Sequence, residues 1–136
     1  MKIFKPEENL TSIIDLIRNA KKSVTIVSPY NSLQGWDELI NTMNDAGKRI
    51  ELNYFVRKDE GINGIENLDL KHVKVFEVPM LHAKMLFSES EAIISSGNLT
   101  NRPDLNWVCG LENQEYDQIV GFFQKYIQPI AVRYLK

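Results

Sequence analysis

The chain has 136 residues, of which 43% are hydrophobic and 25% are charged, and its formal net charge is −2 at pH 7. This size and composition predict a single globular domain over residues 1–136, and the weak negative charge argues against a protein that binds nucleic acid through a basic tail, although a local basic groove stays open. The lone Cys109 rules out an intrachain disulfide, and no apolar run approaches the roughly 18 residues of a membrane span. We therefore expect a cytoplasmic protein without stable membrane association.

Four elements are predicted before residue 58, in the order helix, strand, helix, strand. Their approximate ranges are 6–22, 23–28, 36–47 and 50–56. Both helices carry apolar residues at helical spacing, and Gly47 is typical of a helix end. The first strand is β-branched and almost entirely apolar, which indicates a central strand covered on both faces, and Pro29 ends it. The second strand ends beside Arg57.

The second half of the chain reads mainly as strands and ends in a helix. The predicted ranges are a strand at 73–78, hairpin strands at 82–87 and 92–95, a turn at 101–104, a strand at 107–111 and a helix at 116–127. Together with the first half, this order predicts an α/β fold, in which a mixed β-sheet is flanked by helices on both faces.

The hairpin carries the residues that indicate chemistry. Side chains alternate across a strand, so His82 and Lys84 are expected to share one face, where an imidazole and an ammonium would make a phosphate site. The second strand leads into a turn that contains Ser96 and Asn98, and the hairpin should return this turn to the side of His82. Ser96 and Asn98 can equally be read as ordinary turn residues.

These residues resemble the motifs of the phospholipase D superfamily, which are H-x-K-x4-D, then G-S-x-N, then N-x-E. His82, Lys84, Asn98 and Asn106 match the pattern. The resemblance implies that one histidine attacks phosphorus and forms a phosphohistidine, while a second histidine protonates the leaving oxygen and later activates water. It also implies that Lys84 and Asn98 bind the non-bridging oxygens, and that no metal or other cofactor takes part.

Three positions depart from the family pattern. The aspartate of the first motif falls at Glu89. Ser88 is the alternative for this position, because the spacing from His82 to Asn98 is one residue shorter than is usual in the family. Ser95 replaces the glycine of the second motif. Val108 replaces the glutamate of the third, and a valine cannot orient an imidazole as that carboxylate is expected to do.

The predicted site therefore has catalytic residues His82, Lys84 and Asn98 and substrate-binding residues Ser96 and Arg57. Arg57 is included because ligands bind beyond the carboxyl ends of strands in open α/β sheets. Three functions fit these residues. The first is a metal-independent phosphodiesterase, in particular a nuclease; the second is a catalytically degenerate module that binds nucleic acid or a protein partner; the third is a phospholipase or transphosphatidylase.

The chemistry requires two imidazoles around one phosphorus, and the chain has only two histidines. His72 stands between lysines at the start of a strand, where a solvated structural role is expected. A homodimer would instead supply a second copy of His82 across a two-fold axis. Met80, Leu81 and Trp107 are the residues expected in that interface.

Overall fold

The computed structural model describes residues 1–100 and 105–135. The turn predicted at 101–104, with its Arg102, lies outside the described residues. The helices are α1 (Asn9–Asn19), α2 (Asp37–Arg49) and α3 (Asn113–Phe122), with 3₁₀ turns at Pro6–Glu8 and Gln128–Ile130 and a π-turn at Phe123–Ile127. The strands are β1 (Lys2–Ile3), β2 (Ser23–Val27), β3 (Asn31–Ser32), β4 (Glu51–Arg57), β5 (Val73–Val78), β6 (Met85–Ser88), β7 (Ala92–Ser95), β8 (Leu99–Thr100), β9 (Val108–Leu111) and β10 (Val132–Arg133).

Eight of the strands of the described chain form one mixed sheet in the order β1-β9-β7-β6-β2-β4-β5-β10. The central strands β2, β4 and β5 run parallel, while the hairpin strand β6 joins β2 antiparallel, with Ile26 paired to Leu86. The two-residue strands β3 and β8 pair parallel to each other outside this sheet.

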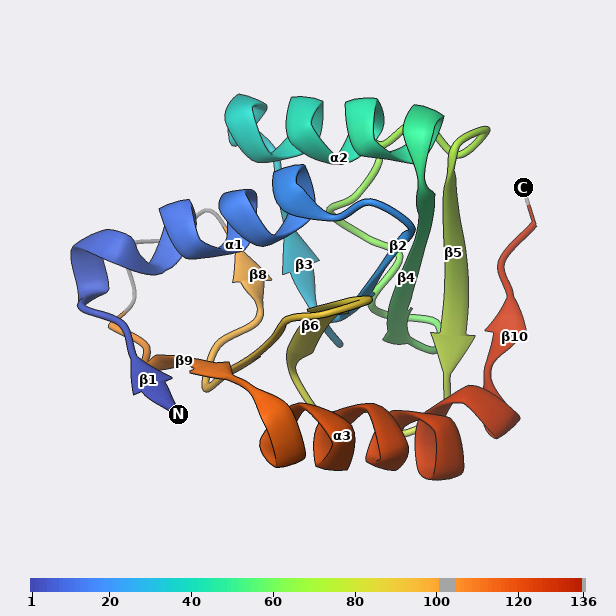
Figure 1. Ribbon diagram of the computed structural model, residues 1–136. Helices are drawn as coiled ribbons and strands as arrows, with labels where there is room; N and C mark the ends of the chain where they lie inside the picture. Colours follow the sequence, from blue (N-terminus) through green and yellow to red (C-terminus); the bar gives the residue numbers. More distant parts are fainter. Residues whose placement is uncertain (101–104, 136) are drawn as a thin grey trace.

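Helices cover both faces of the sheet, as the sequence predicts. In Figure 1, α1 and α2 lie along one face and α3 along the other. The core on the first face contains Ile17, Met43 and Leu86, all nearly or fully buried, and the core on the second face contains Phe87 and Phe123, whose rings meet edge to face at 5.2 Å. Successive residues of β6 thus face opposite cores, because strand side chains alternate.

The helix α1 ends at Asn19, so the prediction that it continues to Lys22 is wrong. The guanidinium of Arg49 donates to the carbonyls of Ile17 and Arg18 in the last turn of α1, at 2.9 and 3.0 Å, and to that of Ala20 just beyond it, at 2.6 Å. A helix leaves its last carbonyls without partners inside the helix, and here a side chain from the end of α2 satisfies two of them. The chain can therefore turn into β2 at this point.

The helix α2 runs through Gly47 to Arg49, so the prediction that Gly47 ends it is also wrong. A Cβ at Gly47 would lie 2.8 Å from the carbonyl oxygen of His72. The glycine therefore allows α2 to pack closely against the chain just before β5, and it does not terminate the helix.

The strand β6 begins at Met85, so His82 and Lys84 precede the strand instead of lying in it. Its partner β2 stops at Val27, which pairs with Met85, and Pro29 has no N–H with which to extend the ladder. On the other side the ladder reaches one residue further, since the N–H of Ser95 donates to the carbonyl of Lys84 at 3.2 Å.

Candidate active site

One edge of the sheet gathers the predicted site residues. The parallel strands β2, β4 and β5 end there, β6 begins there, and β7 returns to it. In open α/β sheets such an edge is the usual place for a ligand.

Lys84 sits at this edge with its side chain partly withdrawn from solvent. Its Nζ donates to the carbonyl oxygen of His82 at 2.8 Å, while the His82 side chain is exposed. Burial lowers the pKa of the Lys84 ammonium below its ordinary value. An ammonium that has lost part of its hydration gains more from an anionic ligand than a fully solvated one does.

Asn98 is held in one orientation by the end of β2. The N–H of Tyr30 donates to Oδ1 of Asn98 at 3.2 Å, and the N–H of Leu99 donates to Oγ of Ser28 at 2.9 Å. The amide oxygen is used in this way, while Nδ2 of Asn98 makes no hydrogen bond to the residues that the structure describes, so its two N–H donors can serve a ligand.

A buried polar network lies under this turn. The hydroxyl of Tyr54 donates to Oδ1 of Asn31, and Nδ2 of Asn31 donates to the carbonyls of Ser28 and Gly61, at 2.9 and 3.0 Å. Burial raises the pKa of Tyr54 well above its ordinary value. The phenol therefore stays neutral and serves as a fixed donor that braces the end of β2.

A cavity of about 410 Å³ opens beside Lys84 and Asn98, both of which line it. Its remaining wall comes from the start of α1 and from the first core, and includes Leu10, Trp36 and Val108. Arg57, His82 and Ser96 lie outside this lining. The structure thus brings Lys84 and Asn98 to one cavity and leaves His82 two residues away at the surface.

Arg57 is engaged with neighbours on both sides. Its Nε donates to Glu60 at 2.9 Å, and its Nη1 donates to the carbonyl of Leu81 at 3.0 Å. The hydroxyl of Tyr30 donates to the same Glu60 carboxylate at 3.2 Å. In this arrangement Arg57 fixes the backbone directly before His82.

Ser96 joins the ends of β7 and β9. Its Oγ donates to Oδ1 of Asn106 and accepts from the N–H of Trp107, both at 3.1 Å. Gly97 allows this packing, because a Cβ there would lie 2.4 Å from the amide nitrogen of Asn106. The hydroxyl of Ser96 therefore holds the turn that presents Asn98.

Comparison with known proteins gives similarity at the level of structure. No family model and no curated protein matches the chain. The solved structure of Nuc from Salmonella typhimurium, a phospholipase D family member, superposes with a TM-score of 0.74 at 13% identity over 99% of each chain. NucT from Helicobacter pylori superposes at 0.76, with 12% identity over 98% of each chain. The chain has the phospholipase D fold.

Two larger proteins share this fold over part of their length. TrmBL2, an archaeal chromatin protein whose structure shows a mode of DNA binding, matches 98% of this chain and 55% of its own, with a TM-score of 0.70 and 10% identity. The phosphatidylserine synthase of Haemophilus influenzae matches 93% of this chain and 36% of its own, with a TM-score of 0.68 and 17% identity.

Glu89, which the resemblance places at the motif aspartate with Ser88 as the alternative, lies at the end of β6 remote from Lys84. Its carboxylate accepts hydrogen bonds from the N–H groups of Lys21, Lys22 and Ser23, at 2.9–3.2 Å. Burial alone would raise the pKa of Glu89, but these N–H groups together lower it below its ordinary value. The residue holds the turn between α1 and β2 and lies at the end of β6 away from Lys84.

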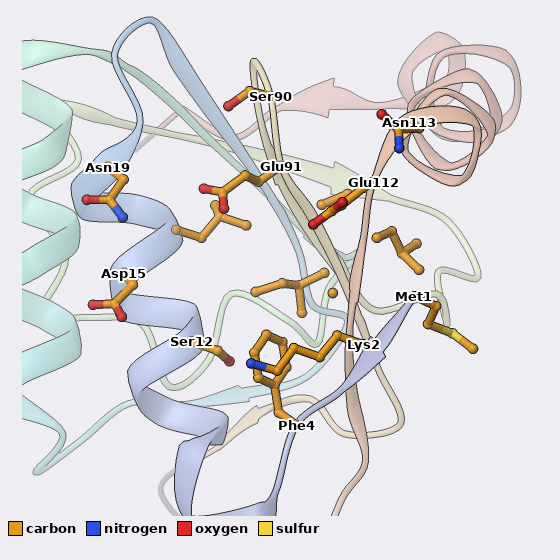
Figure 2. A pocket seen from close by; sticks show the side chains of 15 residues that line it. Met1, Lys2, Phe4, Ser12, Asp15, Asn19, Ser90, Glu91, Glu112 and Asn113 are labelled. Carbon is orange, nitrogen blue, oxygen red and sulfur yellow. The ribbon is translucent and has the colours of Figure 1, made fainter.

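Val108, in place of the motif glutamate, is 3% exposed and lines the cavity. Glu112, further along the chain, lies beyond the other end of β9 and faces a separate hollow of about 720 Å³, shown in Figure 2. Asp15 and Glu91 also line that hollow, and Lys2 is the one lysine among its described lining residues. Its acidic rim suits an anion less well than the cavity beside Lys84 does.

The second histidine of the chain lies at the opposite end of the sheet. His72 directly precedes β5 and pairs with Asp69 at 3.8 Å, whereas His82 follows the other end of β5. The six residues of that strand separate the two ends by roughly 20 Å. In the described ranges, moreover, no group of three or more His, Cys, Asp or Glu side chains is placed to hold a metal ion.

The sequence did not predict the role of the residues that brace the site. The buried strand β2 is followed directly by Ser28, Tyr30 and Asn31. Polar residues directly after a buried strand are the sequence feature that could have indicated their role. Their partners could not be read from the sequence, because Leu99 and Asn98 come from a turn far along the chain.

No described helix is long and apolar enough to cross a bilayer.

Proposed function

We propose that this protein is a metal-independent phosphodiesterase that cleaves nucleic acid, with His82 as the nucleophile. The observation that carries the proposal is that Lys84 and Asn98, from opposite sides of the hairpin, line one cavity beside the His82 backbone. Both side chains offer N–H donors, which is what the non-bridging oxygens of a phosphodiester require.

The reaction proceeds in two displacements. His82 attacks phosphorus, the bond to the leaving oxygen breaks, and a second imidazole gives that oxygen its proton. A water then gives a proton to the second imidazole and attacks the phosphohistidine, which frees His82. Lys84 and Asn98 stabilise the negative charge that grows on the non-bridging oxygens in both steps.

A second copy of the chain supplies the second imidazole. His72 is at the far end of the sheet, so the partner's His82 is the group that two-fold symmetry would bring to the phosphorus. Met80 and Trp107, 84% and 52% exposed, flank the site and are suited to such an interface. Leu81 is only 4% exposed and packs in the second core, so the expectation that it lies in the interface is wrong.

A second function is favoured by one specific observation. Val108 leaves the cavity without the carboxylate that the phospholipase D motif provides, and no other carboxylate lines it among the described residues. Such a site could bind a nucleic acid without cleaving it, and TrmBL2 combines the same fold with DNA binding.

The test is cleavage of labelled single- and double-stranded oligonucleotides in excess EDTA by the wild type, His82→Ala and His72→Ala. The proposal predicts that the wild type and His72→Ala cleave and that His82→Ala does not. Activity that EDTA abolishes and Mg²⁺ restores would overturn it. Equal binding by all three proteins with no cleavage would establish the binding function instead.

A further inference from the structure

His82 stands on a stretch of chain that no strand ladder holds. It lies between β5 and β6, and in the described chain neither Leu81 nor His82 takes part in a backbone–backbone hydrogen bond. Two cationic side chains bind this stretch instead. Nη1 of Arg57 donates to the carbonyl of Leu81 at 3.0 Å, and Nζ of Lys84 donates to the carbonyl of His82 at 2.8 Å. These two carbonyls belong to the peptide units on either side of the His82 Cα.

Holding both peptide units fixes the direction in which the His82 side chain leaves the backbone. A residue has two soft backbone dihedrals, φ and ψ, and both are set once the peptide planes before and after the residue are held. The imidazole itself is exposed, and Val108 stands where the phospholipase D motif has the carboxylate that would orient it. The backbone is therefore what aims the imidazole in this structure, and attack on phosphorus requires an accurate aim.

The carboxylate of Glu60 holds Arg57 in the orientation that this contact requires. Its Oε2 accepts from Nε of Arg57 at 2.9 Å and from the hydroxyl of Tyr30 at 3.2 Å, and the guanidinium lies over the Tyr30 ring, 5.9 Å from the ring centre. A guanidinium is planar, so its bonds through Nε and Nη1 together fix its plane. Without Glu60, the long and partly exposed Arg57 side chain regains rotamers that turn it away from Leu81.

We propose that Glu60 is a positioning residue for the nucleophile: through Arg57 and the Leu81 carbonyl, it sets the direction of the His82 imidazole. The inference rests on the proposed function, because it concerns the aim of the nucleophile in that reaction. Glu60 itself touches neither the substrate nor the reacting atoms. It is placed by the turn after β4, in which its N–H donates to the carbonyl of Arg57 at 3.2 Å.

The sign of the effect separates this role from the effect of charge alone. A carboxylate near an anionic substrate repels it, so removal of a Glu60 with no other role should strengthen binding and speed cleavage. If Glu60 positions His82, its removal should slow cleavage although a repulsive charge has gone. Variants of Arg57 cannot make this distinction, because the loss of a cation would weaken the binding of an anion in either case.

Steady-state cleavage of a labelled oligonucleotide in EDTA provides the first test. Glu60→Ala should lower kcat about tenfold without raising KM, within the roughly 10²-fold that misplacement of a reacting group can cost. Glu60→Gln keeps an oxygen that can accept from both Arg57 and Tyr30, so it should keep most of the rate. Glu77→Ala is the matched control and should leave kcat unchanged, because the Glu77 carboxylate on the neighbouring strand β5 bonds to the N–H of Asp59.

The second test does not depend on cleavage. Backbone ¹⁵N relaxation gives the order parameter of the His82 N–H, which should be about 0.85 in the wild type and fall below about 0.6 in Glu60→Ala. The value in Glu60→Gln should stay close to that of the wild type. His72, at the far end of β5, should keep its order parameter in both variants. The Glu60 side chain is 56% exposed, so its replacement should leave the fold intact.

The outcomes separate the inference from the proposed function. A Glu60→Ala protein that cleaves as fast as the wild type or faster, or that keeps a rigid His82, would overturn the inference and leave the proposed function standing. An equal loss of kcat in Glu77→Ala would also overturn it, because the loss would then not depend on the contact to Arg57. If the wild type cleaves nothing, the proposed function fails, and the order parameters alone decide the inference.

Discussion

The backbone N–H of Tyr30 donates to Oδ1 of Asn98, at 3.2 Å, and this contact ties the end of β2 to the turn after β7. It decides which way the Asn98 amide faces, because the oxygen is occupied while, within residues 1–100 and 105–135, the two N–H donors of Nδ2 are not. The site thereby acquires donors that are oriented before any substrate arrives, which is the property that electrostatic stabilisation of a transition state requires.

Asn98→Ala should lower the rate of phosphodiester cleavage by roughly 10²–10³-fold, which is the usual effect of removing one donor of this kind. Asn44 on α2 offers a matched control, since its amide also bonds to backbone groups but lies away from the site. Asn44→Ala should leave the rate unchanged. Steady-state kinetics of the two variants checks the prediction, and an equal loss in both would refute the role of Asn98.

Lys84→Met should abolish cleavage without lowering the free energy of unfolding at pH 7. Burial lowers the pKa of Lys84 from 10.5, so the charged ammonium destabilises the folded state. This destabilisation is present at pH 7 and disappears only as the pH rises from the folded pKa to the pKa of the unfolded chain. Because the folded pKa is lowered, Lys84 should lose its proton at an alkaline pH that is still below 10.5, and cleavage by the wild type should decline there. Denaturant unfolding tests the stability prediction, and a pH–rate profile tests the prediction for cleavage. Lys48→Met, at an exposed lysine, is the control. A loss of stability in Lys84→Met that Lys48→Met does not show would contradict the prediction.

Glu89→Gln should destabilise the fold at pH 7 by about 1 kcal/mol, which is below the usual range for hydrogen bonds to charged groups because solvent reaches the carboxylate. The folded pKa of Glu89 is depressed, so its contribution is present above the unfolded value of about 4.5 and is lost as the pH falls through the folded pKa. The stability difference between the wild type and Glu89→Gln should therefore shrink below pH 4.5. Glu91→Gln, on the same hairpin, should show no such difference in denaturant unfolding.

Two helix glycines should respond to alanine in opposite directions. Gly121 in α3 has open space where the methyl group of an alanine would lie, so Gly121→Ala should stabilise the protein by up to about 1 kcal/mol. Gly47→Ala would force a methyl to 2.8 Å from the His72 carbonyl and should destabilise it by about 1 kcal/mol or more. Thermal unfolding of both variants decides this, and a stabilising Gly47→Ala would show that the contact is not tight.

The sequence predicted those elements whose pattern is local. The strand at 73–78 and the hairpin strand at 92–95 occur with the predicted bounds, because apolar β-branched runs bounded by turn residues carry their own signal. The two-residue strands β1, β3, β8 and β10 were not predicted. Strands this short have no periodicity and exist because a neighbouring segment pairs with them.

The sequence predicted which residues form the candidate site. It did not predict the contacts that these residues make with groups from distant parts of the chain. Lys84 and Asn98 meet at one cavity, as the hairpin spacing suggested. The substrate-binding roles of Arg57 and Ser96 stay predictions, and in the structure their polar groups also bond to Glu60, Leu81 and Asn106. Sequence spacing cannot show that a side chain is already occupied by groups from elsewhere in the chain.

The measurement that tests the central claim most directly is activity in mixtures of wild-type and His82→Ala chains, after subunit exchange is confirmed. A composite site that needs one His82 from each copy is intact only in the wild-type homodimer. The account predicts that activity falls as the square of the wild-type fraction. Activity that declines linearly with that fraction would contradict the account, since each chain would then work without its partner's imidazole.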